Sequence, residues 1–173
     1  MAEIDFITAF GRLLRDGKLR DEFAQDPLAV AKRIQLRPAE LTAWQQLIPA
    51  DVEFQAAVLL RKRLALVKFY LPETSQRLGE ELWPTFQRYA RQHWPGEANA
   101  KLHDAFRFCQ QLRQQQPTAV VAVEWNRLQV ALTKHGLAFY PAQLRVRGKN
   151  RRGIQLLLRS RRQMREYFFH LGL

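Results

Sequence analysis

The side chains that most often carry catalysis or bind metals are few in this 173-residue chain. The four histidines are His93, His103, His135 and His170, and none has a metal-binding partner four residues further on. A metal site needs three or four ligands that converge on one point. We therefore interpret the histidines as structural residues and predict no metal site.

The remaining candidates for chemistry also have structural explanations. Cys109 is the single cysteine, so an intrachain disulfide and a multi-cysteine metal centre are excluded. It lies on the apolar stripe of an expected helix, and a buried thiol without a cationic neighbour is unreactive. Gly148 and Gly153 frame a basic turn rather than a phosphate-binding loop. We predict that the protein is not an enzyme and holds no cofactor.

The positive charge is concentrated at the C-terminal end. The chain has 28 Lys and Arg against 16 Asp and Glu, a net charge of +12. Residues 137–173 carry nine cationic side chains and one acidic side chain, a net +8. Such an excess favours an acidic protein or peptide partner, or nucleic acid, with an anionic membrane surface as the weakest alternative. The predicted partner- or nucleic-acid-binding residues are Arg145, Arg147, Lys149, Arg151, Arg152, Arg161 and Arg165.

Apolar residues at spacings of three and four predict helices through the first 115 residues. The longest is expected over 51–71, where Pro72 ends it. Asp26 before Pro27 is typical of a helix start. The residues expected on buried stripes are Ile7, Phe10 and Leu14; Ala56, Leu60, Leu64, Val67 and Leu71; Leu82, Phe86, Tyr89 and His93; and Leu102, Ala105, Phe106, Cys109 and Leu112.

The pattern changes near Gly136. Thr118 is expected to cap a helix that ends there, with Val121, Trp125, Leu128 and Leu132 inward. Residues 143–147 alternate with period two, 148–153 read as a turn, and 154–158 are apolar, which together predict a β-hairpin. Ser160 is expected to cap a last helix. Because unpaired guanidinium groups are costly to bury, we expect one continuous exposed cationic surface, with Leu144, Val146, Leu156, Met164 and Phe168 packed inward.

The predicted fold class is mainly α: a multi-helix bundle with a small C-terminal β-hairpin and a terminal helix. We expect a helical domain over 1–115 and a basic helix–hairpin–helix extension over 116–173 packed on it. The N-terminus shows no secretory signal, and no run of about 18 apolar residues is present. The expectation is a cytoplasmic protein with no transmembrane segment, for which peripheral membrane contact is the least favoured kind of binding.

Residues 12–112 contain a characteristic pattern of packing and capping residues. It includes Asp26-Pro27, Arg61-Lys62-Arg63, Leu71-Pro72-Glu73-Thr74, Leu78-Gly79 and Asp104-Ala105-Phe106. This pattern resembles that of a family of bacterial helical proteins. Members include partner proteins of multinuclear iron-dependent oxidases that modify ribosomally made peptides, and related domains are labelled as DNA-binding. The N-terminal part is also similar to the small helical subunit of extradiol ring-cleaving dioxygenases.

This resemblance implies a non-catalytic binding or adaptor protein. Such a protein recruits or positions a protein or peptide partner, for example for a peptide-modifying enzyme. The alternative function rests on charge instead, and is a nucleic-acid-binding protein that uses the basic C-terminal hairpin and helix.

Overall fold

The computed structural model describes residues 3–96, 100–133, 135–146, 149–161 and 163–170, without the side chains of 144–146, 150 and 170. The chain forms two compact units. The first contains residues 1–65 and 83–94, and the second contains 66–82 and 95–173. The predicted division at residue 115 stays a prediction, but the unit that holds the C-terminal strands also includes residues 66–82.

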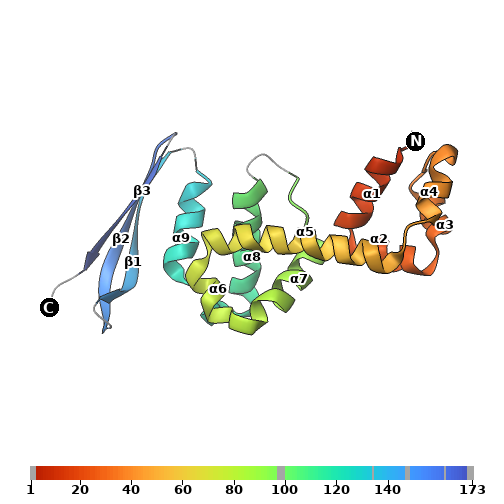
Figure 1. Cartoon of the computed structure of the whole chain (residues 1–173). Helices are drawn as coiled ribbons and strands as arrows, with labels where there is room; N and C mark the ends of the chain where they lie inside the picture. Colours follow the sequence, from red (N-terminus) through yellow and green to blue (C-terminus); the bar gives the residue numbers. More distant parts are fainter. Residues whose placement is uncertain (1–2, 97–99, 134, 147–148, 162, 171–173) are drawn as a thin grey trace. The chain divides into compact units, whose positions relative to one another are not determined.

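The first unit is built from short helices and most of one long helix (Figure 1). Asp26 caps α3 as expected, since its carboxylate accepts a hydrogen bond from the Ala29 N–H at 2.9 Å. The buried indole of Trp44 donates to the Pro27 carbonyl and meets Phe23 edge to face. The elements are α1 (Phe6–Arg15), α2 (Gly17–Gln25), α3 (Pro27–Arg33), η1 (Pro38–Glu40), α4 (Leu41–Gln45), α5 (Pro49–Tyr70), which continues into the second unit, and α7 (Leu82–Gln92).

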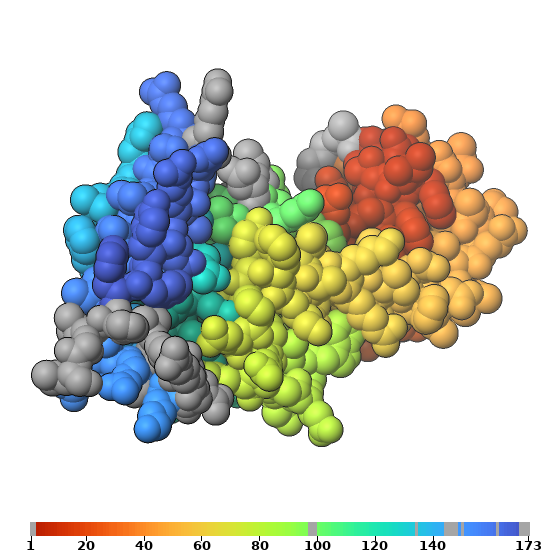
Figure 2. Space-filling model, turned by 60° about the vertical axis from the view of Figure 1, so that its left-hand side comes forward, coloured from red at the N-terminus to blue at the C-terminus, as the bar shows by residue number. Residues whose placement is uncertain are grey.

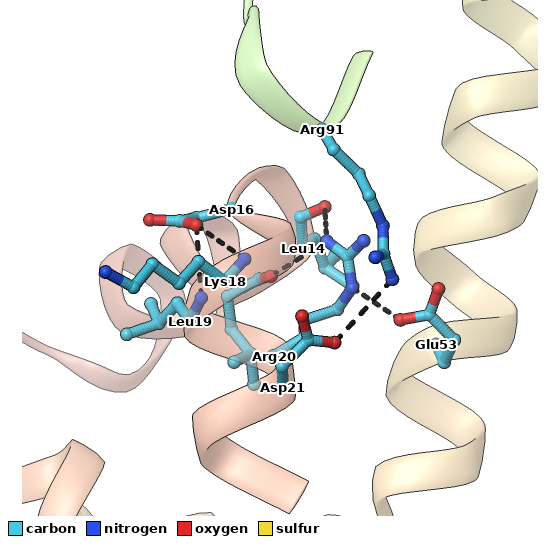
Figure 3. Close-up of polar contacts among 9 residues, drawn as sticks. Leu14, Asp16, Lys18, Leu19, Arg20, Asp21, Glu53 and Arg91 are labelled. Atoms are coloured by element: carbon cyan, nitrogen blue, oxygen red, sulfur yellow. Dashed lines mark hydrogen bonds and ion pairs between the residues drawn. The ribbon is translucent and has the colours of Figure 1, made fainter. Parts of the chain in front are cut away.

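A buried arginine joins three parts of this unit (Figure 3). Arg20, 6% exposed, donates from Nε to the Glu53 carboxylate at 2.6 Å and from Nη1 to the Leu14 carbonyl at 2.9 Å. Nearby, Arg91 and Asp21 form a longer pair of 3.6 Å between two exposed side chains. The guanidinium therefore ties α2 to the end of α1 and to α5.

The helical part of the second unit packs α9 against α8. Glu124, only 2% exposed, accepts hydrogen bonds from the Glu73 and Thr74 N–H groups at the start of α6. Thr74 in turn accepts a hydrogen bond from the Val121 N–H. These contacts join α6 to α9. The elements are α6 (Pro72–Leu78), η2 (Gly79–Glu81), α8 (Ala100–Gln115), η3 (Pro117–Ala119) and α9 (Ala122–Ala131).

The second unit ends in a three-stranded antiparallel sheet of order β1-β2-β3. The strands are β1 (Gly136–Val146), β2 (Lys149–Arg159) and β3 (Met164–His170). The helix α9 contacts β1 and β2 and lies between the sheet and α8 (Figure 1). The sheet is thus covered by a helix on one face.

The expected mainly α fold with a C-terminal hairpin is confirmed, but the predicted terminal helix is wrong. Residues 164–170 form β3, because Tyr167, Phe168 and Phe169 favour strands and the edge of β2 supplies backbone partners. The predicted turn over 148–153 is also wrong from Lys149 onward. Residues 149–153 pair with 142–146, so strand pairing overrides the turn-like composition.

The predicted helical stripes are mostly confirmed. Every predicted inward residue of α5 is buried, and so are Leu82, Phe86 and Tyr89 on α7. The stripe on α1 is displaced, since Ile7 is 82% exposed while Ala9 and Leu13 are buried. Thr118 does not cap α9 as expected, because it lies in η3. The residue that directly precedes α9 is Val121. Within the described ranges, no helix is long and apolar enough to cross a membrane.

Candidate partner-binding surface

The inner face of the sheet is fixed to α9 by a buried amide. Gln155 is 0% exposed, donates to the Val123 carbonyl at 3.0 Å and accepts from Asn126 Nδ2 at 3.0 Å. Leu157, two residues further along β2, is also 0% exposed. Because side chains alternate along a strand, the neighbouring residues of β2 must point away from α9.

The opposite face, here called the outer sheet face, is apolar and exposed. Its residues lie in three rows across the strands, given by the pairing register. Phe139 and Phe169 are 63% and 53% exposed, and Leu137 is 60% exposed. Figure 2 shows the strands, in blue, at the surface of the molecule. The rows are Leu137–Leu158–Arg165, Phe139–Leu156–Tyr167 and Pro141–Ile154–Phe169.

Two predicted arginines border this outer sheet face. Arg165 is exposed at the end of the first row. Arg152 is exposed two residues before Ile154, on the same side of β2. Neither forms an ion pair with a carboxylate among the described residues. An apolar centre with a cationic border is typical of a protein interface.

The other predicted cations do not gather there. Lys149 and Arg151 are exposed but lie on the inner side of β2, opposite Arg152. Arg161 lies where β2 passes into β3, and its Nε donates to His135 Nε2 at 3.3 Å. Lys149 is the first of the eleven residues of β2, and Arg161 follows the last of them. The two ends of the strand are on the order of 35 Å apart at 3.4 Å per residue.

The expected single cationic surface is therefore divided over two faces and two ends of the sheet. The side chain of Arg145 and all of Arg147 lie outside the described residues, as do the side chains of Leu144 and Val146. Leu156 was expected to pack inward, but the register places it on the outer sheet face. Phe168 has the inner orientation and is still 45% exposed, since it lies on an edge strand.

A pocket of about 520 Å³ adjoins the outer sheet face near the β1–β2 end. Pro141 and Ile154 belong to both surfaces, and Arg77 and Arg152 contribute the two cations of its wall. Arg77 donates a 3.4 Å hydrogen bond to the Thr118 carbonyl. The remaining lining residues are Val120, Val121, Ala122, Val123, Ala142, Gln143 and Gly153. The pocket is large enough to hold an apolar side chain.

The sequence reasoning missed the apolar part of this surface. Phe139 and Leu137 were not singled out, and Tyr167 was expected inside a helical core. The available signal was the placement of Leu137, Phe139 and Pro141 at every second position, which is the strand period. It was overlooked because the hairpin was expected to begin only at Gln143.

No constellation for metal chemistry is present within the described part of the chain. Burial, with a smaller contribution from the charge of Glu124, raises the pKa of the Cys109 thiol to about 12. The thiol is thus protonated at neutral pH and is not a nucleophile there. This agrees with the structural interpretation of Cys109.

Part of the chain matches a known protein family. The model of the family described as SCO6045-like, C-terminal domain, matches residues 46–114. The match lies largely within residues 12–112, the stretch on which the expected resemblance rests, but its description names neither an oxidase nor DNA. No curated protein and no solved structure matches the chain.

Proposed function

We propose that this protein is a non-catalytic adaptor that binds an acidic protein partner on the outer sheet face. The observation that carries the proposal is the exposure of Phe139, Tyr167 and Phe169 around the aliphatic centre of the sheet. An antiparallel sheet with one face on a core usually has a polar second face. An apolar second face indicates that a partner covers it.

The free energy gained by burying these apolar side chains is sufficient for binding. Burying a side chain such as Phe139 or Leu137 contributes about 1.5–3 kcal/mol each. Ordering of side chains and loss of free motion offset part of this gain. A few such residues, with the adjoining pocket as an anchor point, are enough for a specific complex.

Charge selects the kind of partner. In a face-to-face dimer of this chain, the described residues of the opposite outer sheet face would offer no carboxylate to Arg152 and Arg165, so these cations would enter the interface unpaired. Like charges across an interface oppose association, whereas carboxylates opposite these arginines favour it. The net charge of +12 acts in the same direction. An acidic protein or peptide with an apolar patch therefore fits this surface better than a second copy.

Nucleic acid is the second candidate, and one observation favours it. Phe139, Tyr167 and Phe169 present rings beside arginines, and exposed rings on a sheet can stack with bases. The central strand, however, presents Ile154, Leu156 and Leu158, which have no ring for stacking. The aliphatic centre supports the protein partner, which the resemblance over residues 12–112 also implies.

The test uses the full chain as bait in an extract of the native host, with and without nuclease. The surface variants are Phe139→Ser and Phe169→Ser. Phe54→Ser is the matched control, because Phe54 is 61% exposed on α5. Proteins whose capture depends on the outer sheet face are identified, purified and titrated against each bait.

The expected result is nuclease-resistant capture of an acidic protein. Each surface variant should weaken its binding at least about tenfold, as the loss of 1.5 kcal/mol or more predicts, while Phe54→Ser leaves it unchanged. Equal capture by all baits would overturn the proposal. Capture that disappears with nuclease would assign the surface to nucleic acid instead.

A further inference from the structure

A second pocket, of about 720 Å³, lies at the other end of the sheet from the one described above. It is formed where α5 ends, α8 begins, α9 ends and β2 passes into β3. Figure 2 shows the strands, in blue, beside the end of α5, in yellow. The lining residues are Tyr70, Ala100, Lys101, Leu102, Ala131, Arg159 and Met164. This volume is in the range of small-molecule sites.

The charge of the pocket has one sign. Arg159 and Lys101 are its charged residues, and no carboxylate lines it among the described residues. Lys101 also belongs to the first turn of the 16-residue helix α8, where the helix dipole is positive. The pocket is therefore a place where an anion is stabilised.

Arg159 is incompletely satisfied within the described structure. Its Nε is buried and has no hydrogen-bond partner. A buried donor without an acceptor costs about 1–3 kcal/mol, so this arrangement needs compensation. An arginine that only completed the C-terminal end of α9 would donate to one of the last carbonyl groups of that helix. No such bond from Arg159 is found among the described residues.

The rest of the wall is apolar. Leu102, Met164 and Ala131 contribute aliphatic surface, and Tyr70 contributes a ring with a hydroxyl group. A planar guanidinium pairs with both carboxylate and phosphate groups. From this combination we infer that the pocket binds a small organic anion, with its carboxylate or phosphate at Arg159 and Lys101 and its apolar body against Leu102 and Met164. This site is separate from the outer sheet face, because Arg159 and Met164 lie on the inner side of the strands.

The test is titration of the full chain with simple probes, followed by two-dimensional ¹H–¹⁵N NMR. Phenyl phosphate and phenylacetate carry a ring and a charge, inorganic phosphate carries the charge alone, and benzyl alcohol carries the ring alone. The Nε–H resonance of Arg159 is the direct reporter. We expect it to shift saturably with at least one charged aromatic probe and to remain unshifted with benzyl alcohol.

Variants separate the pocket from the general positive charge. Arg159→Gln should weaken binding of the charged aromatic probe at least about tenfold, as expected for a lost charge-assisted contact of 1.5 kcal/mol or more. Lys101→Gln, on an exposed helix position, should weaken it severalfold and serves if the first variant does not fold. Arg165→Gln is the matched control on the opposite face and should leave binding within about twofold.

Three results would overturn the inference. The first is the absence of a saturable shift with either charged aromatic probe up to about 10 mM. The second is an equal loss of affinity in Arg159→Gln and Arg165→Gln, which would indicate diffuse charge. The third is equal affinity for inorganic phosphate and the aromatic probes, which would remove the apolar walls from the site. If the proposed acidic partner were disproved, this test would be unaffected, since the pocket and the outer sheet face share no residue.

Discussion

The side-chain amide of Gln155 donates a 2.7 Å hydrogen bond to the carboxylate of Glu166. The two residues lie on the inner side of β2 and β3. The second carboxylate oxygen of Glu166 accepts from Arg127 of α9 at 2.8–2.9 Å. Together with the contacts of Gln155 to Val123 and Asn126, this network determines which face of the sheet packs on α9. It thereby determines which face of the sheet stays exposed.

Replacing Glu166 by Ala should destabilise the second unit. The change removes one acceptor of a fully buried amide and the carboxylate partner of Arg127. The expected loss is about 1–3 kcal/mol in the free energy of unfolding, measured by urea denaturation. Glu80→Ala is the control, because Glu80 is exposed, and it should stay within about 0.5 kcal/mol. Equal effects of the two changes would contradict the network.

The alternation of side chains between the two faces of the sheet can be tested with two leucines, one on each face. Leu157→Ala should cost about 2–5 kcal/mol, since Leu157 is fully buried against α9. Leu137→Ala should cost much less, because Leu137 is 60% exposed on the outer sheet face. Thermal or urea unfolding of both variants checks the register. A larger effect at Leu137 would mean that the faces are exchanged.

The sequence predicted the parts of the fold that depend on local patterns. The stripe of Ala56, Leu60, Leu64, Val67 and Leu71 has the period of one helix, and all of these residues are buried. The N-cap at Asp26 was predictable in the same way, because the capping carboxylate and Pro27 are neighbours in the chain. Helical periodicity and capping act within a few residues.

The third strand was not predictable by the same reasoning. Met164, Tyr167 and Phe168 fit a helical stripe, while Arg165, Tyr167 and Phe169 fit a strand equally well. The free edge of β2 decides between them, and it is a tertiary feature. The same error concealed the outer sheet face, since the alternation of Tyr167 and Phe169 has meaning only when β3 pairs with β2. Charge alone directed the prediction to the C-terminal region but could not divide its arginines between the faces of the sheet.

The buried arginine of the first unit gives a third prediction (Figure 3). Arg20→Lys should destabilise the protein by about 1–3 kcal/mol, although the charge is kept. A single ammonium group cannot reach both Glu53 and the Leu14 carbonyl, which are bound by different nitrogens of the guanidinium. Asp21→Ala is the control, since its pair with Arg91 is exposed and 3.6 Å long, and should change stability by less than about 1 kcal/mol. Chemical denaturation distinguishes the two.

The last prediction concerns Cys109 and alkaline pH. Burial raises its pKa to about 12 from an ordinary value of 9.0, so the folded state favours the protonated thiol. At pH 8 only about one native molecule in ten thousand carries the thiolate, and a disulfide reagent should react with Cys109 mainly after unfolding. A group whose pKa is raised on folding contributes stability below its unfolded pKa and loses it as pH rises towards its folded pKa. Stability should therefore fall between about pH 9 and pH 12, and Cys109→Ala should remove this part of the pH dependence. Rapid reaction of the native thiol at pH 8 would contradict the buried position of Cys109.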